Sequence, residues 1–340
     1  MKTTARTLAE VLIGLRPGEN IVHPQLTLVP LMVNPDVDRS LEPYLLLEEA
    51  LEAGCLEISE VNDIGEVSAL RAVNRCPIPV LLYDGEELVG AKQNRILNTT
   101  VLLGQGETLL PVSCVEAGRW NMRSPAFRAG SGPAHPELRA LKTRHVTANV
   151  RRRQQARPTE PTFDFRSDQS RVWSEVAERS VRLGSHSPTS AMADVYRDRE
   201  QEVAAVVEEV GAALRRRAAQ AADGPWGVGW GIIGLVAILN NRFACADLLL
   251  PSERFGVISP KLLRGYALQA LDPTAGIGRP PVEDAEEFTL RLLAALKEAQ
   301  TEIGPGVGLG EDLRFDAPGF NGAGVVWQGG LLQLSVFPEG

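Results

Sequence analysis

The sequence predicts an α+β protein in which mostly antiparallel, hairpin-rich sheets form two halves joined by a helical middle segment. Short apolar strands with turn dipeptides fill both ends of the chain, and a stretch with helical periodicity lies between them. Strands and helices do not alternate as in parallel βαβ units. We expect a strand-rich N-terminal half at 1–130, a basic and helical middle at 131–224 and a mixed α/β C-terminal half at 225–340. One continuous domain is the alternative.

In the N-terminal half, apolar spacing and turn residues predict each element in turn. We expect a helix over 7–15, a buried strand over 26–33, a helix over 44–51, and strands over 56–61 and 70–73. Ser40 is the predicted cap of the second helix, and Gly54 the left-handed residue after it.

Three later segments share a hairpin pattern. They cover 79–91, 235–246 and 324–336, with turns at Asp84-Gly85, Asn240-Asn241 and Gln328-Gly329-Gly330. Such dipeptides favour two-residue hairpin turns because the central positions need positive φ. The similarity hints at a diverged internal duplication, but independent convergence of hairpins on one pattern is the favoured explanation.

Helical patterns fill the rest of the chain. They predict a helix around 172–176, a helix start at Ser187-Pro188, an amphipathic helix over 199–222, a helix from Ser259-Pro260 to residue 271, and another over 282–301. The glycine-rich stretch 304–312 matches no phosphate-binding fingerprint, so we interpret it as a turn. The basic run 139–157 contains no aromatic residues, which favours a solvated helix or connector over an RNA-binding surface.

Composition excludes several classes of protein. The chain has 340 residues, 44% of them hydrophobic, and a formal charge of −8. This composition is typical of a soluble globular protein and argues against a general nucleic-acid binder. Four separated cysteines without a CxxC pair indicate a reducing cytoplasm and no zinc site. No apolar run is long enough to cross a membrane or to form a signal peptide. We therefore expect a cytoplasmic protein whose core needs no disulfide.

Polar side chains concentrate between short apolar strands at residues 83–120. Amides and charges of both signs suit phosphate oxygens and the polar edge of a base or ribose. The predicted ligand-binding residues are Glu87, Lys92, Gln93, Asn94, Arg95, Asn98, Arg119 and Trp120. The alternatives are a solvated strand with cross-strand ion pairs and a tryptophan that belongs to the core.

The same stretch resembles a known family. The segments PVLLYDGEELVGAKQNRILN and PVSCVEAGRW are similar to the signature of a prokaryotic domain family named for its association with ADP-ribosylglycohydrolases and with rhodanese and phosphatase-superfamily proteins. Segments at 167–173, 187–189, 260–268 and 331–337 extend the resemblance over nearly the whole chain. The resemblance implies a role in NAD-linked or ADP-ribose-linked metabolism. Gln333 departs from it, because a histidine is expected there.

Candidate catalytic residues follow from the carboxylates and one thiol. Asp84, Glu86, Glu87 and Glu116 could form a cluster that holds Mg²⁺ or supplies an acid and a base, although Asp84 suits its turn better. Glu116 is the preferred acid or base. Cys114 is a weaker candidate nucleophile, because free cysteine is more often a buried thiol.

These features predict a protein that binds or processes a phosphorylated, nucleotide-like small molecule. The alternative is a non-enzymatic interaction module whose polar motif stabilises the fold. A protein partner or a homo-oligomer is compatible with either hypothesis, and the sequence does not decide whether the protein is an enzyme.

Overall fold

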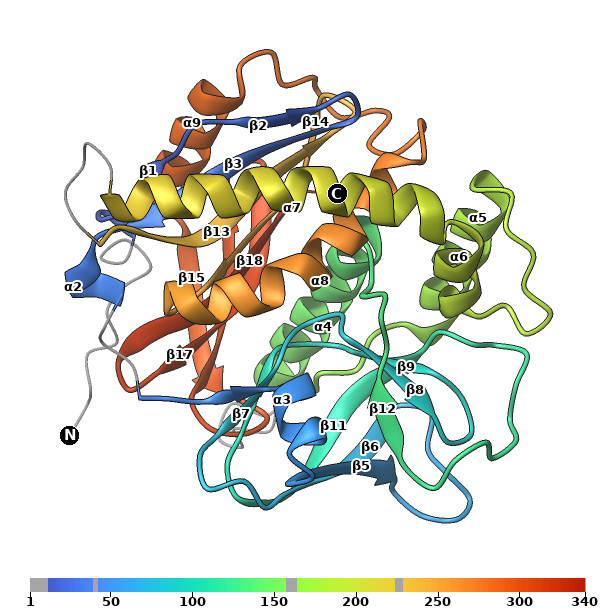
Figure 1. The fold of residues 1–340 in the computed structure, drawn as a ribbon. Coiled ribbons are helices and arrows are strands. Elements are labelled where there is room, and N and C mark those ends of the chain that lie inside the picture. The colour runs from blue at the N-terminus through green and yellow to red at the C-terminus, as the bar shows by residue number, and fades with distance from the viewer. Residues whose placement is uncertain (1–11, 39–41, 157–163, 224–228, 340) are drawn as a thin grey trace. The chain divides into compact units, whose positions relative to one another are not determined.

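The computed structural model describes residues 12–38, 42–156, 164–223 and 229–339 (Figure 1). The chain forms two compact units, each assembled from separate stretches. Unit 1 comprises Met1–Glu42, Gln201–Ile303 and Asp312–Gly340, and unit 2 comprises Pro43–Glu200 and Gly304–Glu311. The three-part division at 1–130, 131–224 and 225–340 stays a prediction.

Unit 1 is built on one large sheet in the order β1-β3-β13-β14-β18-β17-β16-β15, with β2 paired to β3. Its strands are β1 (Arg16–Pro17), β2 (Ile21–His23), β3 (Leu26–Val33), β13 (Gly231–Leu239), β14 (Arg242–Leu249), β15 (Gln300–Pro305), β16 (Glu311–Ala317), β17 (Phe320–Trp327) and β18 (Gly330–Pro338). Strand β3 confirms the strand predicted over 26–33. The predicted helix over 7–15 lies largely outside the described residues.

The helices of unit 1 are α2 (Pro35–Asp38), α7 (Glu200–Asp223), α8 (Ser252–Ala270) and α9 (Ala285–Lys297). Apolar side chains of α9, including Leu292 and Leu296, join strand residues in the main core. The amphipathic helix predicted over 199–222 is confirmed as α7. The helix start predicted at Ser259-Pro260 is wrong, because α8 begins at Ser252 and carries Pro260 in its interior.

Unit 2 contains two smaller sheets, in the orders β10-β7-β4 and β12-β8-β9-β11-β6-β5. Its strands are β4 (Leu45–Leu46), β5 (Leu56–Glu60), β6 (Ala69–Asn74), β7 (Val80–Leu82), β8 (Glu87–Gly90), β9 (Arg95–Leu97), β10 (Val101–Leu103), β11 (Gly106–Cys114) and β12 (Phe127–Ala129). Pairing is antiparallel except between β4 and β7. The predicted α+β class with mostly antiparallel sheets is confirmed.

The helices of unit 2 are α3 (Leu47–Glu52), α4 (Pro136–Ala156), α5 (Gln169–Arg182) and α6 (Met192–Asp198). Gly54 has the predicted positive φ, at 68°. Ser40, the predicted cap before α3, lies outside the described residues. Ser187 does not begin a helix. Its hydroxyl accepts from the Ala191 N–H at 2.7 Å in the turn before α6.

Two of the three predicted hairpins are confirmed. β13 and β14 pair around Asn240 and Asn241, with φ of 50° and 59°, and β17 and β18 pair around Gln328 and Gly329, with φ of 54° and 78°. The third is wrong. Asp84-Gly85 forms a turn, but β7 pairs with β10 and β4 while β8 pairs with β9 and β12. This turn therefore passes the chain from one sheet to the other.

Cys55 and Cys76 form a disulfide, which the sequence interpretation did not anticipate. It joins the residue before β5 to the residue two positions after β6. Cys114 and Cys245 are free and buried. Unit 2 therefore has a covalent link at one end of its larger sheet.

A buried polar network lies in the sheet of unit 1 at the position where the resemblance expects histidine. Gln333 donates to the Ser335 hydroxyl at 2.7 Å, and Ser335 donates to Asp247 at 2.8 Å. The Tyr266 hydroxyl also donates to Asp247, at 2.5 Å. All four side chains are at most 2% exposed, so this network belongs to the core.

Candidate functional site

Asp84 anchors helix α4 to the turn between the two sheets of unit 2. Its carboxylate accepts from Arg139 Nε at 3.1 Å and from Lys142 Nζ at 2.8 Å. Burial lowers the pKa of Lys142, and Asp84 opposes that shift. Gly85 is needed beside this ion pair, because its φ is 81° and a Cβ would lie 2.9 Å from Arg139 Cγ. The interpretation of 139–157 as a solvated helix or connector is therefore wrong for the first turns of α4.

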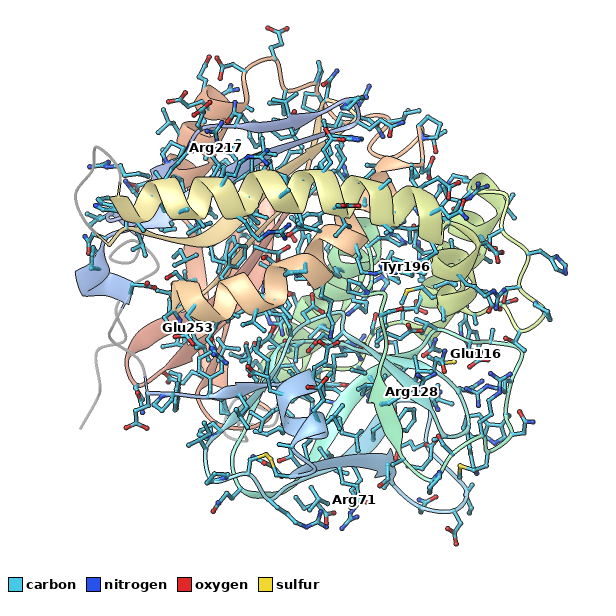
Figure 2. The ribbon with its side chains drawn as sticks, viewed as in Figure 1. Arg71, Glu116, Arg128, Tyr196, Arg217 and Glu253 are labelled. Carbon is cyan, nitrogen blue, oxygen red and sulfur yellow. A yellow bond between two sulfur atoms is a disulfide. The ribbon has the colours of Figure 1, made fainter. Side chains whose placement is uncertain are left out.

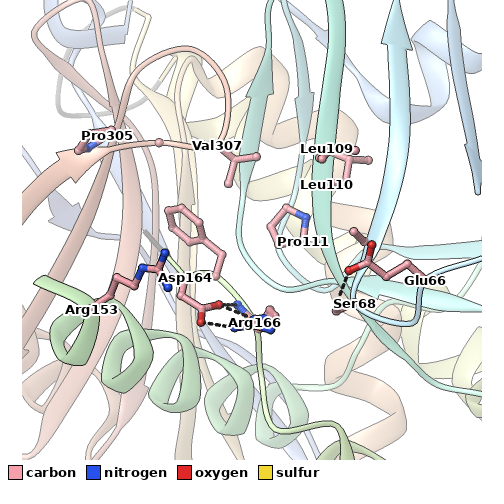
Figure 3. A pocket seen from close by; sticks show the side chains of 13 residues that line it. Glu66, Ser68, Leu109, Leu110, Pro111, Arg153, Asp164, Arg166, Pro305 and Val307 are labelled. Carbon is pink, nitrogen blue, oxygen red and sulfur yellow. Dashed lines mark hydrogen bonds and ion pairs between the residues drawn. The ribbon is translucent and has the colours of Figure 1, made fainter. Parts of the chain in front are cut away.

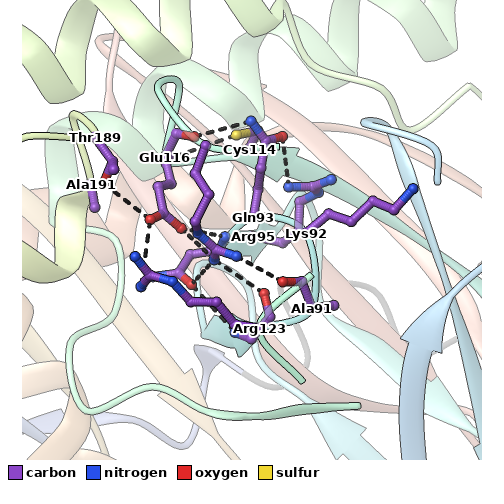
Figure 4. A network of polar contacts seen from close by, with 12 residues as sticks. Ala91, Lys92, Gln93, Arg95, Cys114, Glu116, Arg123, Thr189 and Ala191 are labelled. Carbon is purple, nitrogen blue, oxygen red and sulfur yellow. Dashed lines mark hydrogen bonds and ion pairs between the residues drawn. The ribbon is translucent and has the colours of Figure 1, made fainter. Parts of the chain in front are cut away.

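The Glu116 carboxylate joins three segments of unit 2 (Figure 4). One oxygen accepts from Arg119 Nη2 at 2.6 Å and from the Asn94 backbone N–H at 3.0 Å. The other accepts from the Thr189 hydroxyl at 3.0 Å. Burial alone would raise the pKa of Glu116, but the bonds from Arg119, Asn94 and Thr189 hold it below its usual value. Glu116 is 1% exposed, so it is a fully paired buried carboxylate.

Arg119 fixes the turn that follows β8. Its guanidinium donates to the carbonyls of Ala91 at 2.7 Å, Asn121 at 3.1 Å and Gly90 at 3.2 Å. It also donates to Asn94 Oδ1 at 3.1 Å. Together with its bond to Glu116, these contacts hold the chain reversal at residues 90–94.

Gln93 and Arg95 lie behind Glu116. The Gln93 amide donates to the Glu116 carbonyl at 3.1 Å and accepts from Arg95 Nη1 at 3.0 Å. Burial lowers the pKa of Arg95, which is 0% exposed. Within the described residues its Nε and Nη2 have no hydrogen-bond partner. Cys114 Sγ accepts from the Glu116 N–H at 3.3 Å and is also completely buried.

Lys92 holds the loop between β5 and β6. Its ammonium donates to the carbonyls of Asp63 and Ile64, both at 2.5 Å, and lies 5.4 Å from the centre of the Trp120 ring. The Arg95 guanidinium lies 5.8 Å from the same ring. Trp120 is one of the predicted ligand-binding residues. Its side chain is 47% exposed, so a ligand can reach it directly.

Glu87 is a second buried carboxyl group near Glu116. Asn94 links the two, because its amide donates to Glu87 at 3.4 Å while its backbone bonds Glu116. Burial raises the pKa of Glu87 to about 8, the Asn94 bond opposes this, and the charges of Glu116 and Asp194 add to it. At neutral pH, Glu87 therefore carries a proton while Glu116 is ionised.

The four candidate carboxylates do not form one cluster. Glu86 accepts from the Tyr83 N–H at 2.7 Å, and Asp84 pairs with α4. In the described part of the chain, no three or more His, Cys, Asp or Glu side chains gather so as to hold a metal ion. The described carboxylates thus offer no Mg²⁺ site of that kind.

Asn98 connects the motif to a cavity. Its amide accepts from the Ser113 hydroxyl at 2.7 Å and donates to the Phe165 carbonyl at 3.1 Å. The Gln169 side chain likewise bonds both backbone groups of Cys114, at 2.8 Å each. These contacts fix the segment 164–169 against β9 and β11.

The cavity has a volume of about 460 Å³, within the range of small-molecule sites (Figure 3). Its apolar wall includes Leu109 and Pro111 of β11, Phe165, and Val307 from the returning segment Gly304–Glu311. Leu109 is 55% exposed, so the wall presents apolar surface that a ligand can cover.

Charged groups line the other side of this cavity. Arg166 donates to both oxygens of Asp164, at 2.9 and 2.8 Å. This bidentate pair lowers the pKa of Asp164 and raises that of Arg166. Arg153 of α4 also lines the cavity and, in the described ranges, has neither a hydrogen bond nor an ion pair. The sequence analysis did not select Asp164 or Arg166, and it considered Arg153 only as part of the basic run 139–157.

A family model described as the ARG and Rhodanese-Phosphatase-superfamily-associated Protein domain (ARPP-1) matches residues 14–337. The chain belongs to this family. The match to the ARPP-1 domain confirms the resemblance inferred from the motif at 83–120 and covers both units. No significant match was found among curated proteins or among solved structures.

The ARPP-1 domain is associated with ADP-ribosylglycohydrolases and with rhodanese and phosphatase-superfamily proteins, and this association loosely suggests a context related to ADP-ribose. No helix in the described ranges combines the length and apolar character that a membrane crossing requires.

Proposed function

We propose that unit 2 binds a phosphorylated, nucleotide-like small molecule from ADP-ribose or NAD metabolism in the cavity beside β11. One observation carries the proposal. The cavity combines two guanidinium groups, Arg153 and Arg166, with an apolar wall formed by the strand that bears the family motif.

The chemistry of the lining supports this ligand class. Guanidinium groups bind phosphate oxygens in a planar, often bidentate geometry. Asp164 holds Arg166 in one orientation, and Arg153 is available to an anion. Leu109 and Phe165 offer apolar surface for a sugar or a base. Asp164 and Glu66 supply acceptors for ribose hydroxyls.

In this proposal, two predicted ligand-binding residues act as positioning residues. Lys92 holds the loop that leads to Glu66 and Ser68 of the cavity, and Asn98 holds the Phe165 backbone. Glu116 and Cys114 stay predicted catalytic residues. To act as an acid or base, Glu116 must come within about 3 Å of a reacting atom.

A structural role for the motif is the second candidate function. The specific observation is that both oxygens of Glu116 are occupied by protein donors in a buried site. In this version the polar motif stabilises unit 2, and the protein acts as a non-enzymatic interaction module.

Thermal melting against ADP-ribose, NAD, AMP and inorganic phosphate tests the first candidate. A ligand at 100 times its dissociation constant adds about 2.7 kcal/mol, which shifts a melt by several degrees. We expect a shift in the wild type that is reduced in Arg153→Gln and retained in the neighbouring control Arg152→Gln. Arg152 bonds Asn149 on the exposed side of α4.

Two results would contradict the proposal. One is no shift with any of these ligands, and the other is an equal shift in wild type and Arg153→Gln. A melt of Glu116→Gln far below the wild type, together with no ligand shift, would favour the interaction module.

The cytoplasm stays the proposed location. Disulfides are rare in a reducing cytosol, so the bond between Cys55 and Cys76 weighs against it. Rapid alkylation in intact cells, followed by denaturation and mass spectrometry, decides the matter. Four alkylated cysteines support the cytoplasm, and two contradict it.

A further inference from the structure

A second cavity, of about 430 Å³, lies within unit 1 between helices α7 and α8. Its lining takes one face of each helix, together with the first residues of β13. Figure 1 shows α7 and α8 extending alongside each other over the sheet. This cavity shares no residue with the proposed phosphate site, so the two can be tested separately.

Small residues create the space between the helices. Apart from its chain neighbours and the nearby backbone of α8, no atom lies within 4 Å of the position that a Cβ on Gly256 would take. The nearest atoms to a Cβ on Gly211 are Arg215 Nη1 at 3.5 Å and Leu263 Cδ1 at 3.8 Å. Glycine is unfavourable within a helix by roughly 1 kcal/mol relative to alanine, so its presence on both helices indicates that the open space matters.

The walls are largely apolar. Leu214 faces the cavity from α7, and Phe255 and Leu263 face it from α8. Pro260 lacks an N–H, which leaves the Gly256 carbonyl without its usual helical partner. The Ser259 hydroxyl donates to that carbonyl at 3.2 Å. The Ser259 hydroxyl therefore keeps this backbone acceptor satisfied at the cavity wall.

One cation lies in this apolar lining. Arg215 extends over Gly211 and, in the described part of the chain, has neither an ion pair nor a side-chain hydrogen bond. The nearest acid in the lining, Glu253, already pairs with Arg254 at 2.8 Å (Glu253 is labelled in Figure 2). The cavity thus offers apolar walls and an available positive charge.

We propose that this cavity binds a free single-chain amphiphile with an anionic head, such as a medium-chain carboxylate. The chain lies between α7 and α8, and the carboxylate accepts from Arg215. The lining of α8 from Ser252 to Leu263 spans roughly 16 Å at 1.5 Å per residue, which suits an elongated ligand.

Isothermal titration of the full-length protein with octanoate, decanoate and decyltrimethylammonium, below their micellar concentrations, tests this proposal. Each added methylene should tighten binding about fourfold, so decanoate should bind roughly tenfold or more tightly than octanoate. The cationic amphiphile should bind far more weakly than decanoate.

Variants separate this site from adsorption elsewhere. Arg215→Gln should weaken decanoate binding by about tenfold, because a charge-assisted hydrogen bond is lost. Arg216→Gln, at the next position and outside this lining, should leave binding unchanged. Gly211→Leu should abolish binding by filling the cavity. If Gly211→Leu does not fold, Gly256→Leu provides the same test.

Three outcomes would overturn the proposal. They are no heat of binding with decanoate, equal affinity in wild type and Arg215→Gln, and decanoate binding that survives both leucine variants. Sedimentation with anionic vesicles distinguishes a free amphiphile from the surface of a lipid bilayer as the ligand. Binding to vesicles without binding to soluble decanoate would make this a membrane surface and overturn the proposal as well.

Discussion

Glu116 is the residue on which the polar motif depends most. Its carboxylate bonds Arg119, Asn94 and Thr189, and both partners of the ion pair have side chains at most 2% exposed. Replacing Glu116 by glutamine leaves the Arg119 charge buried without its counter-ion. Breaking a buried pair in this way costs about 3–5 kcal/mol.

We therefore expect Glu116→Gln to lower the free energy of unfolding by about 3–5 kcal/mol in urea titrations. Thr189→Val, which removes one neutral donor from the same carboxylate, should cost only about 1 kcal/mol. A glutamine variant within 1 kcal/mol of the wild type would show that the pair is not a main support of unit 2.

The raised pKa of Glu87 predicts that the free energy of unfolding changes with pH in the opposite direction to the change that most carboxylates cause. Its pKa is about 8 in the folded protein, compared with 4.5 as the ordinary value. Between these values the folded state holds a proton that the unfolded state has lost, so stability falls as pH rises from about 4.5 to 8. The full difference corresponds to about 5 kcal/mol.

The variant Glu87→Gln keeps a neutral side chain at this position and removes the titration. We expect it to flatten the decline in unfolding free energy between pH 5 and 8, measured by denaturant titration at each pH. Glu116 acts in the other direction, because its lowered pKa stabilises the fold above about pH 4.5. Identical pH profiles for wild type and Glu87→Gln would refute the raised pKa.

At this scale the sequence predicts a polar motif but not the surroundings of its residues. The motif at 83–120 predicts polar recognition, and the structure brings Asn94, Glu116 and Arg119 together. The sequence could not show that their bonds are satisfied internally, because Thr189 comes from a segment about 70 positions further along the chain. Arg153 and Asp164 were missed for the same reason.

Whether the sequence predicts an element correctly depends on whether the interactions that determine that element are local in sequence. Asn240-Asn241 determines a hairpin through its own backbone preferences. Asp84-Gly85 has the same chemistry, but β7 pairs with β10 and β4, so the turn joins two sheets. Pro260 resembles a helix start, whereas Ser259 satisfies the carbonyl that proline leaves free.

Helix α4 yields a prediction at this scale. Its first turns place Arg139 and Lys142 against Asp84, and all three side chains are at most 7% exposed. Asp84→Asn should cost about 3–5 kcal/mol, because the buried Lys142 and Arg139 then lose the negative charge of Asp84. Denaturant titration measures this, with Arg152→Gln on the exposed face of α4 as the control. A cost below 1 kcal/mol would contradict the role of this ion pair in docking α4.

At the scale of the whole molecule, neither unit is continuous in sequence. The glycine-rich spacing of 304–312 predicts a turn, whereas the structure assigns Gly304–Glu311 to unit 2. There the Leu309 N–H donates to the Leu102 carbonyl at 2.7 Å. A Cβ on Gly308 would lie 2.1 Å from that carbonyl oxygen, so glycine allows the close approach. The return of this segment to unit 2 depends on contacts between residues about 200 positions apart in the sequence, which local patterns do not reveal.

The disulfide provides a prediction for unit 2 as a folding unit. It closes a loop with a sequence separation of 21, which corresponds to about 3 kcal/mol in the chain-entropy treatment. We expect a dithiol reductant to lower the denaturation midpoint of the wild type and to leave that of a Cys55→Ser, Cys76→Ser double variant unchanged. An unchanged wild-type midpoint under full reduction would show that the link contributes little.

Hydrogen–deuterium exchange with and without ADP-ribose tests most directly whether the cavity beside β11 binds the ligand while the polar motif at 83–120 has a structural role. We expect slower exchange on ligand addition at residues 109–111, 164–166 and 305–307. Exchange at 93–95 and 114–116 should already be slow and should stay unchanged, because these residues are buried. Ligand protection confined to the motif segments, with none around the cavity, would contradict this assignment.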